Sequence, residues 1–68
     1  MRISKIKTLR VSMGLTQGEL SKKSGISRTT ISQIETSDDF IYTLTLRTLT
    51  KLAGALETSV REIIPENI

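Results

Sequence analysis

Four polar side chains in the segment 28–33 carry the chemistry needed to read the edges of DNA bases. Arg28 can pair bidentately with guanine, Gln33 can do so with adenine, and the methyl group of Thr29 can meet the methyl group of thymine. Ser32 adds a hydroxyl that can donate or accept a hydrogen bond. Taken alone, these residues also fit an ordinary solvated face, so their place in the fold matters.

The four residues share one face if the segment of about 27–36 is a helix. Ser27 is a favoured N-cap residue, and Ile31 and Ile34 recur at the spacing of a buried stripe. Thr30 falls near the edge of the opposite, polar face, which carries no large apolar residue. The pattern therefore predicts a helix that packs through its isoleucines and leaves its polar side chains in solvent.

A second short helix precedes this one, and a glycine separates the two. Thr16 is followed three residues later by Glu19, which is the pattern of a capping box. Gly25 can take the left-handed conformation that a tight turn between helices requires. This layout is typical of a helix-turn-helix, whose second helix can enter the major groove of DNA. The positive N-terminal end of the helix that begins at Gln17 could hold a phosphate.

Apolar residues spaced three and four apart predict further helices on both sides of this unit. The first helix runs from Ile3 to Met13 and ends at Gly14. A fourth helix begins after Thr43 or Thr45. Its predicted inner stripe consists of Leu46, Leu49, Leu52, Ala53 and Leu56.

The remaining segments are predicted to be a loop and a last short helix. Residues 36–43 are rich in turn formers, and Phe40 and Tyr42 within them are expected to cover the core rather than to bind a ligand. Ser59 with Glu62 repeats the capping-box pattern at the start of the last helix.

Composition disfavours an enzyme. The 68 residues include no cysteine and no histidine, so disulfides and thiolate metal sites are excluded and the usual general base is missing. We therefore expect a single domain over residues 1–68, with no catalytic residues, no metal and no cofactor. No apolar run approaches the ~20 residues of a spanning helix. A cytoplasmic protein without a membrane segment is expected.

Charge is distributed unevenly along the chain. Residues 1–35 contain seven basic and two acidic side chains, a net charge of +5, whereas residues 36–68 contain three basic and five acidic side chains, a net charge of −2. A basic half fits a polyanionic partner and fits a solvated charged face about equally well.

Three stretches together resemble the Cro/repressor-type helix-turn-helix family, also called the Xre family. They are IKTLRVSMGLTQGEL, GISRTTISQIE and TLTKLAGALETSVREII, which cover nearly the whole chain in the order and spacing of the family. The resemblance implies an all-α, five-helix, lambda-repressor-like domain. Members usually bind double-stranded operator DNA as symmetric dimers.

The resemblance also assigns roles to residues. Matching positions in the family meet DNA, and here they are Gln17, Ser27, Arg28, Thr29, Thr30, Ser32 and Gln33. We expect Arg28, Thr29, Ser32 and Gln33 to read bases and the other three to hold phosphates. Arg10 and Glu35 fall where the family often has an ion pair between the first and third helices, so a structural role suits Arg10 as well as a phosphate contact does.

The loop after Glu35 departs from the family pattern. Members commonly have a glycine two residues after this glutamate and then basic residues, whereas this chain has Ser37, Asp38 and Asp39. In relatives this loop often approaches the phosphate backbone. Two carboxylates there would either displace the loop from DNA or weaken binding.

The leading hypothesis is a sequence-specific transcriptional regulator, expected to be a repressor, that binds a palindromic operator as a homodimer. The dimer contact is expected around the last helix and the tail, at Val60, Ile64, Ile68 and Tyr42. The alternative is an antitoxin-like or restriction–modification controller module, in which a toxin or co-regulator is the main partner and DNA binding is autoregulatory.

Overall fold

The computed structural model describes residues 4–64, apart from the side chain of Asp38, and this range is helical with no strand. Ile3 and Ile68 therefore lie outside the described residues. The elements are α1 (Lys5–Ser12), α2 (Gln17–Ser24), α3 (Arg28–Thr36), the 3-10 helix η1 (Asp38–Thr43), α4 (Leu46–Ala55) and α5 (Val60–Ile63). The predicted all-α architecture with five α-helices is confirmed.

Side-chain caps set where the first four α-helices begin. A hydroxyl at each N-cap accepts a hydrogen bond from a backbone N–H of the first turn; these caps are Ser4, Thr16, Ser27 and Thr45. Thr16 has the full capping box: its hydroxyl accepts from the N–H of Glu19 at 3.0 Å, and its own N–H donates to the Glu19 carboxylate at 2.8 Å.

The second predicted capping box is wrong. The hydroxyl of Ser59 accepts no capping hydrogen bond at the start of α5. The reason is local: the N–H of Glu62 donates to the backbone carbonyl of Ser59 at 3.0 Å. That bond closes a tight turn and uses the donor that the hydroxyl needed.

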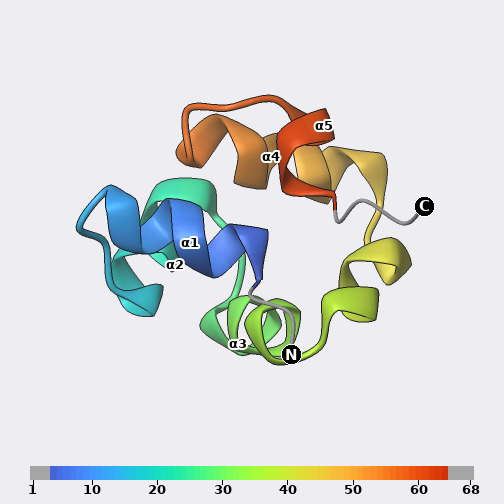
Figure 1. Cartoon of the computed structure of the whole chain (residues 1–68), viewed down its shortest axis with the longest axis horizontal. Helices are drawn as coiled ribbons and strands as arrows, with labels where there is room; N and C mark the ends of the chain where they lie inside the picture. The colour runs from blue at the N-terminus through green and yellow to red at the C-terminus, as the bar shows by residue number, and fades with distance from the viewer. Residues whose placement is uncertain (1–3, 65–68) are drawn as a thin grey trace.

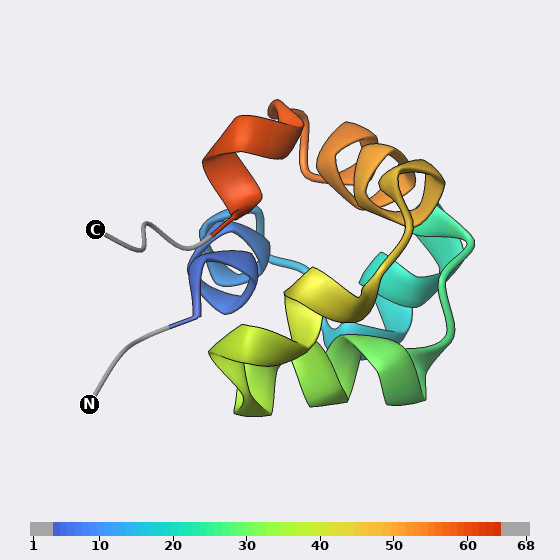
Figure 2. The same ribbon diagram turned by 90° about the vertical axis from the view of Figure 1, so that its right-hand side faces the viewer.

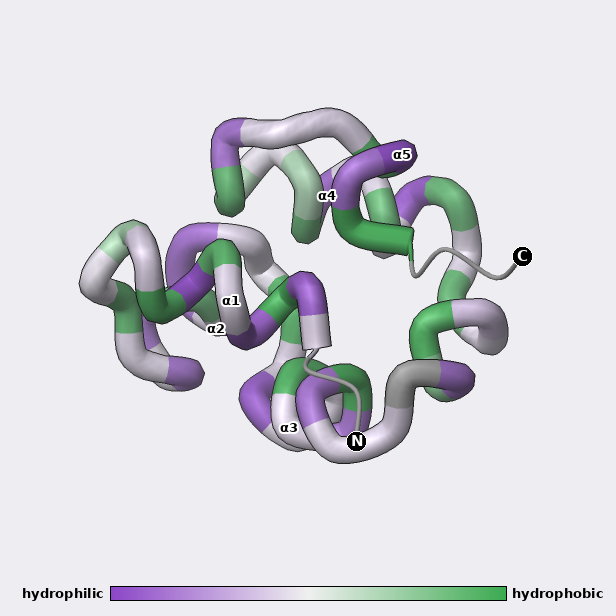
Figure 3. The backbone as a smooth tube through the Cα atoms, viewed as in Figure 1, coloured by the Kyte–Doolittle hydropathy of each residue, from purple (hydrophilic) through white to green (hydrophobic). Residues whose placement is uncertain are grey.

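The helices close a ring around the core. α1 packs on α3 and α5, α2 packs on α3 and α4, and α4 packs on α5, as Figures 1 and 2 show. Hydrophobic segments recur along every helix in Figure 3. Each of the six elements contributes one fully buried side chain: Ile6, Leu20, Ile31, Ile41, Leu52 and Ile63. Burial of each such side chain stabilises the fold by about 1.5–3 kcal/mol.

Two predictions for residues 36–46 are corrected. Most of the expected loop is the 3-10 helix η1, in which Ile41 is buried but Tyr42 remains 50% exposed. Leu46 was expected on the inner stripe of α4, yet it is 71% exposed. Leu46 lies at the edge of the stripe, and as the first residue of α4 it has no preceding turn to cover it.

No helix within residues 4–64 has the length and apolar character to cross a membrane.

Candidate nucleic-acid interface

The outer face of α3 presents four polar side chains to solvent. Ile31 and Ile34 are buried on the inner face, and the opposite face carries the exposed residues Arg28, Thr29, Ser32 and Gln33. These four, together with Gln17 from the start of α2, line one shallow hollow of about 380 Å³. The structure thus brings together all four residues expected to read bases.

The turn between α2 and α3 aims this face outward. Gly25 ends α2 in the left-handed conformation, with φ of 76°. The hydroxyl of Ser21 donates to the carbonyl of Ile26 at 2.6 Å, and the hydroxyl of Ser24 accepts from the N–H of Ile26 at 3.2 Å. Since Ile26 is also buried, the entry of the chain into α3 is held by packing and by hydrogen bonds.

The residues expected to hold phosphates lie at helix N-termini. Ser27 is exposed at the N-cap of α3, and its hydroxyl lies 2.8 Å from the hydroxyl of Thr30, which is half-buried. Gln17 is the first residue of α2. Backbone N–H groups at such helix ends favour an anion. The structure therefore places Ser27 and Thr30 beside Arg28, whereas Gln17 approaches the hollow from the other helix.

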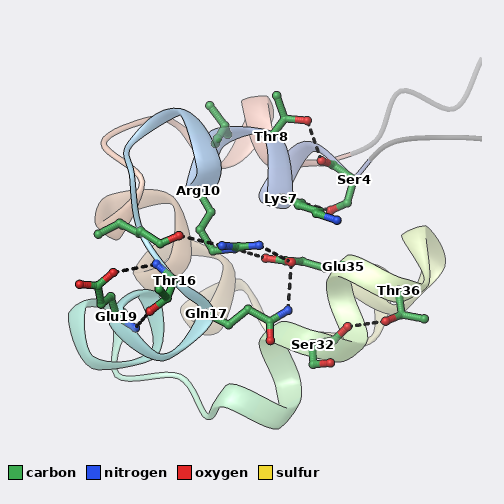
Figure 4. A network of polar contacts seen from close by, with 12 residues as sticks. Ser4, Lys7, Thr8, Arg10, Thr16, Gln17, Glu19, Ser32, Glu35 and Thr36 are labelled. Atoms are coloured by element: carbon green, nitrogen blue, oxygen red, sulfur yellow. Dashed lines mark hydrogen bonds and ion pairs between the residues drawn. The ribbon is translucent and has the colours of Figure 1, made fainter.

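The inner end of α3 is tied to α1 by a charged pair. The Arg10 Nε and Nη2 atoms donate to the two carboxylate oxygens of Glu35 at 2.7 Å and 3.0 Å, as Figure 4 shows. Arg10 Nη1 also donates to the carbonyl of Leu15 at 2.7 Å. The two side chains are only 11% and 5% exposed. The hydrogen bonds with Glu35 raise the pKa of Arg10, although burial lowers it, so the guanidinium stays charged.

Gln17 joins the same pair, which the sequence reasoning missed. Its Nε2 atom donates to Glu35 Oε1 at 3.1 Å. One of the two N–H groups expected to serve a phosphate is therefore already bound within the protein. No spacing rule could have indicated this contact, because the two residues are eighteen positions apart and lie on different helices.

The residues expected at a dimer contact lie on two elements. Val60 and Ile64 are half-buried at α5, and Val60 packs against the core. The carbonyl of Ile64 accepts a hydrogen bond from Lys5 Nζ at 3.4 Å. Tyr42 is half-exposed on η1.

Nothing within residues 4–64 groups three His, Cys, Asp or Glu side chains so that they could hold a metal ion.

Comparison with known proteins agrees with this geometry. A family model described as helix-turn-helix matches residues 6–63. The match spans α1 to α5 and so includes the hollow and the Arg10–Glu35 pair. Searches of curated proteins and of solved structures gave no match.

Proposed function

The chain belongs to the Cro/repressor-type (Xre) helix-turn-helix family of DNA-binding transcription regulators, and on this premise we propose that it is a sequence-specific repressor that binds a palindromic operator as a homodimer. The observation that carries the proposal is the outer face of α3. The four polar side chains expected to read bases are exposed and line one hollow along the first six residues of the second helix of the motif.

Base reading falls to this face. Arg28 pairs with guanine, Gln33 pairs with adenine, and Thr29 and Ser32 add a methyl contact and a hydroxyl. Each good bidentate pair contributes about 1–3 kcal/mol of discrimination against a wrong base. Within residues 4–64, the side chains of Arg28, Thr29 and Gln33 make no hydrogen bond or ion pair, so their polar atoms are available to DNA.

Phosphate contacts would set the register of α3 in the groove. Ser27 and Thr30 stand at the N-terminus of α3, and Gln17 stands at the N-terminus of α2 with one amide N–H left for a phosphate oxygen. These contacts add affinity without sequence preference.

A homodimer would present two such helices to half-sites about one helical turn apart. We assign the dimer contact to Val60, Ile64, Ile68 and Tyr42. Analytical sedimentation of the wild-type chain and of Ile64→Asp measures the oligomeric state and so tests this assignment. The variant is expected to be monomeric and to bind a palindrome more weakly. Its helical circular dichroism should stay as in the wild type.

Selection of bound duplexes from a random DNA pool tests the proposal. The wild-type chain is expected to yield a palindromic consensus, and Arg28→Ala and Gln33→Ala are each expected to lose preference at one base pair of each half-site. Lys51→Ala is the control, since it removes one exposed positive charge from α4. If both α3 variants keep the wild-type consensus and affinity, the reading face lies elsewhere.

A second candidate function is a module that binds a protein partner, such as a toxin or co-regulator, and represses its own gene. The side chain of Leu46, which is 71% exposed, lies outside both the α3 face and the residues assigned to the dimer contact, and it favours this reading. Co-purification of a neighbouring gene product with the wild-type chain, lost in Leu46→Lys, would support it.

A further inference from the structure

We propose that the solvent-exposed face of α4 is a docking surface for an acidic helical segment of a partner protein, in which an apolar stripe is bordered by Asp or Glu. The inference deepens the second candidate function, on which it rests, by naming the chemistry of the partner. The α4 face consists of the exposed residues of this helix: Leu46, Arg47, Thr50, Lys51 and Gly54.

The α4 face lies apart from the residues expected to read bases. α4 stands on the other side of the ring of helices from α3, as Figures 1 and 2 both show. The inner side of α4 is occupied by the core, where Leu52, Ala53 and Leu56 are buried. No residue of the α4 face lines the hollow at α3. A partner bound to α4 therefore leaves that hollow open.

An apolar strip runs along the α4 face. Leu46 is 71% exposed, a larger fraction than for Val11 or Tyr42. The hydroxyl of Thr50 donates to the carbonyl of Leu46 at 2.8 Å, so its hydrogen-bonding capacity is turned toward the helix backbone. Leu46, Thr50 and Gly54 recur every four residues and so lie on the same side of the helix. This strip gives a partner helix a continuous surface to pack against.

The fold of the single chain does not require a glycine at position 54. Gly54 lies within α4 without a positive φ, and a Cβ built there would meet no atom within 4 Å. Glycine inside a helix is less favourable than alanine. A residue without a Cβ does, however, let another backbone approach closely. The glycine therefore suits a helix that crosses α4 at this point.

Charge selects the kind of partner. Arg47 and Lys51 border the strip, α4 contains no acidic residue, and neither cation makes an ion pair within residues 4–64. Glu57, which follows α4, is paired with Lys23 at 3.3 Å. Cations at an interface attract opposite charges and disfavour like ones. An acidic segment therefore matches the α4 face.

Two other occupants fit this face less well. A second copy related by a two-fold axis would bring its own Arg47 and Lys51 to the same patch, where like charges repel. DNA would neutralise the two cations but would leave Leu46 without a contact, because phosphates are bound by polar groups.

The test is a displayed library of peptides of about 14 residues, the length of an ordinary helix, selected on the wild-type chain. Enriched peptides are expected to carry a net negative charge and apolar residues three and four apart. Their affinity is then measured by fluorescence anisotropy on Leu46→Lys, on Gly54→Leu and on Arg47→Glu combined with Lys51→Glu. Val11→Lys is the matched control, since Val11 is an exposed apolar residue of α1.

Leu46→Lys and Gly54→Leu are each expected to weaken peptide binding about tenfold, the scale of one central contact residue. The doubly charge-reversed variant should lose at least as much, and Val11→Lys should bind as the wild type does. Gly54→Ala should raise the midpoint of urea unfolding, because alanine favours the helix and no atom stands in its way.

Peptides that are neutral or basic, or that bind Gly54→Leu as tightly as the wild type, would overturn the inference. So would dissociation of a wild-type dimer by Gly54→Leu in sedimentation, which would assign the face to a second copy. Weaker binding of a random-sequence duplex by the charge-reversed variant at unchanged peptide affinity would assign it to DNA. These results differ from failure of the proposed repressor function, in which the wild-type chain selects no DNA consensus whatever binds to α4.

Discussion

The two faces of α3 carry similar polar residues and use them in opposite ways. On the inner end, the Glu35 carboxylate is 5% exposed and is fully occupied by Arg10 and Gln17. On the outer face, Arg28 and Gln33 are exposed and have no partner among residues 4–64. Burial, rather than residue type, separates the side chains that hold the helix from those that are free for a ligand.

This difference predicts that one face contributes mainly to stability and the other mainly to recognition. A buried charge must be paired, because leaving it unpaired costs several kcal/mol (roughly 3–5). An exposed polar side chain loses little when truncated, because water replaces its partners. Variants of the two faces should therefore differ in whether they change unfolding or DNA binding.

The largest effect is expected for Arg10→Met. It leaves the Glu35 carboxylate without its cation. Because the pair is part-buried rather than fully buried, the free energy of unfolding should fall by about 2–3 kcal/mol, measured by urea denaturation. Arg10→Met combined with Glu35→Leu should recover most of this loss, since it removes both charges. A loss no greater than that of Lys51→Ala would show that the pair does not stabilise the fold.

The pH dependence of that loss has a definite sign. The pKa of Arg10 is raised in the folded state, so the stabilisation is fully present below the unfolded pKa and disappears only as pH rises through the folded value, in strong alkali. The difference between wild type and Arg10→Met should therefore be constant from neutral to mildly alkaline pH.

In contrast to Arg10→Met, Arg28→Ala should weaken DNA recognition and leave stability nearly unchanged. Its free energy of unfolding is expected to stay within about 0.5 kcal/mol of wild type, whereas discrimination at one base pair falls by about 1–2 kcal/mol. Urea denaturation and fluorescence anisotropy on matched duplexes measure the two quantities. A loss of unfolding free energy comparable with that of Arg10→Met would contradict the separate roles predicted for the two faces.

Thr16→Ala and Ser59→Ala compare two capping-box patterns of the sequence, one formed and one not. Thr16 has both bonds of its capping box, so its loss should cost about 1 kcal/mol of unfolding free energy. Ser59 makes no side-chain capping bond, so its loss should cost about 0.2 kcal/mol or less. Equal losses in thermal unfolding would contradict the distinction drawn from the α5 turn.

The smallest effect is expected after α3, in Asp38→Asn with Asp39→Asn. Removal of two negative charges from the start of η1, which follows α3, should tighten DNA binding about two- to threefold at low salt and less at high salt if this segment faces the phosphate backbone. Glu62→Gln with Glu66→Gln removes the same charge from the C-terminal end of the chain and serves as the control. Equal tightening in both double variants would show that only net charge matters.

Much of the fold was predictable because its causes are local. The helix caps at Thr16 and Ser27, the left-handed turn at Gly25 and the buried stripe of Ile31 and Ile34 each depend on residues within about one turn of the chain. The same rules failed where a local pattern had two solutions. At Ser59 the turn satisfied the Glu62 N–H through the backbone instead of the hydroxyl.

By itself, then, the sequence determined an all-α helix-turn-helix chain and the identity of the polar face that α3 leaves in solvent. Only the tertiary structure decided that Leu46 lies in solvent and that Gln17 gives one of its N–H groups to Glu35. The physical reason is distance along the chain. Helix periodicity sets which side of a helix is apolar, but contacts between residues eighteen positions apart depend on how whole helices pack around the shared core.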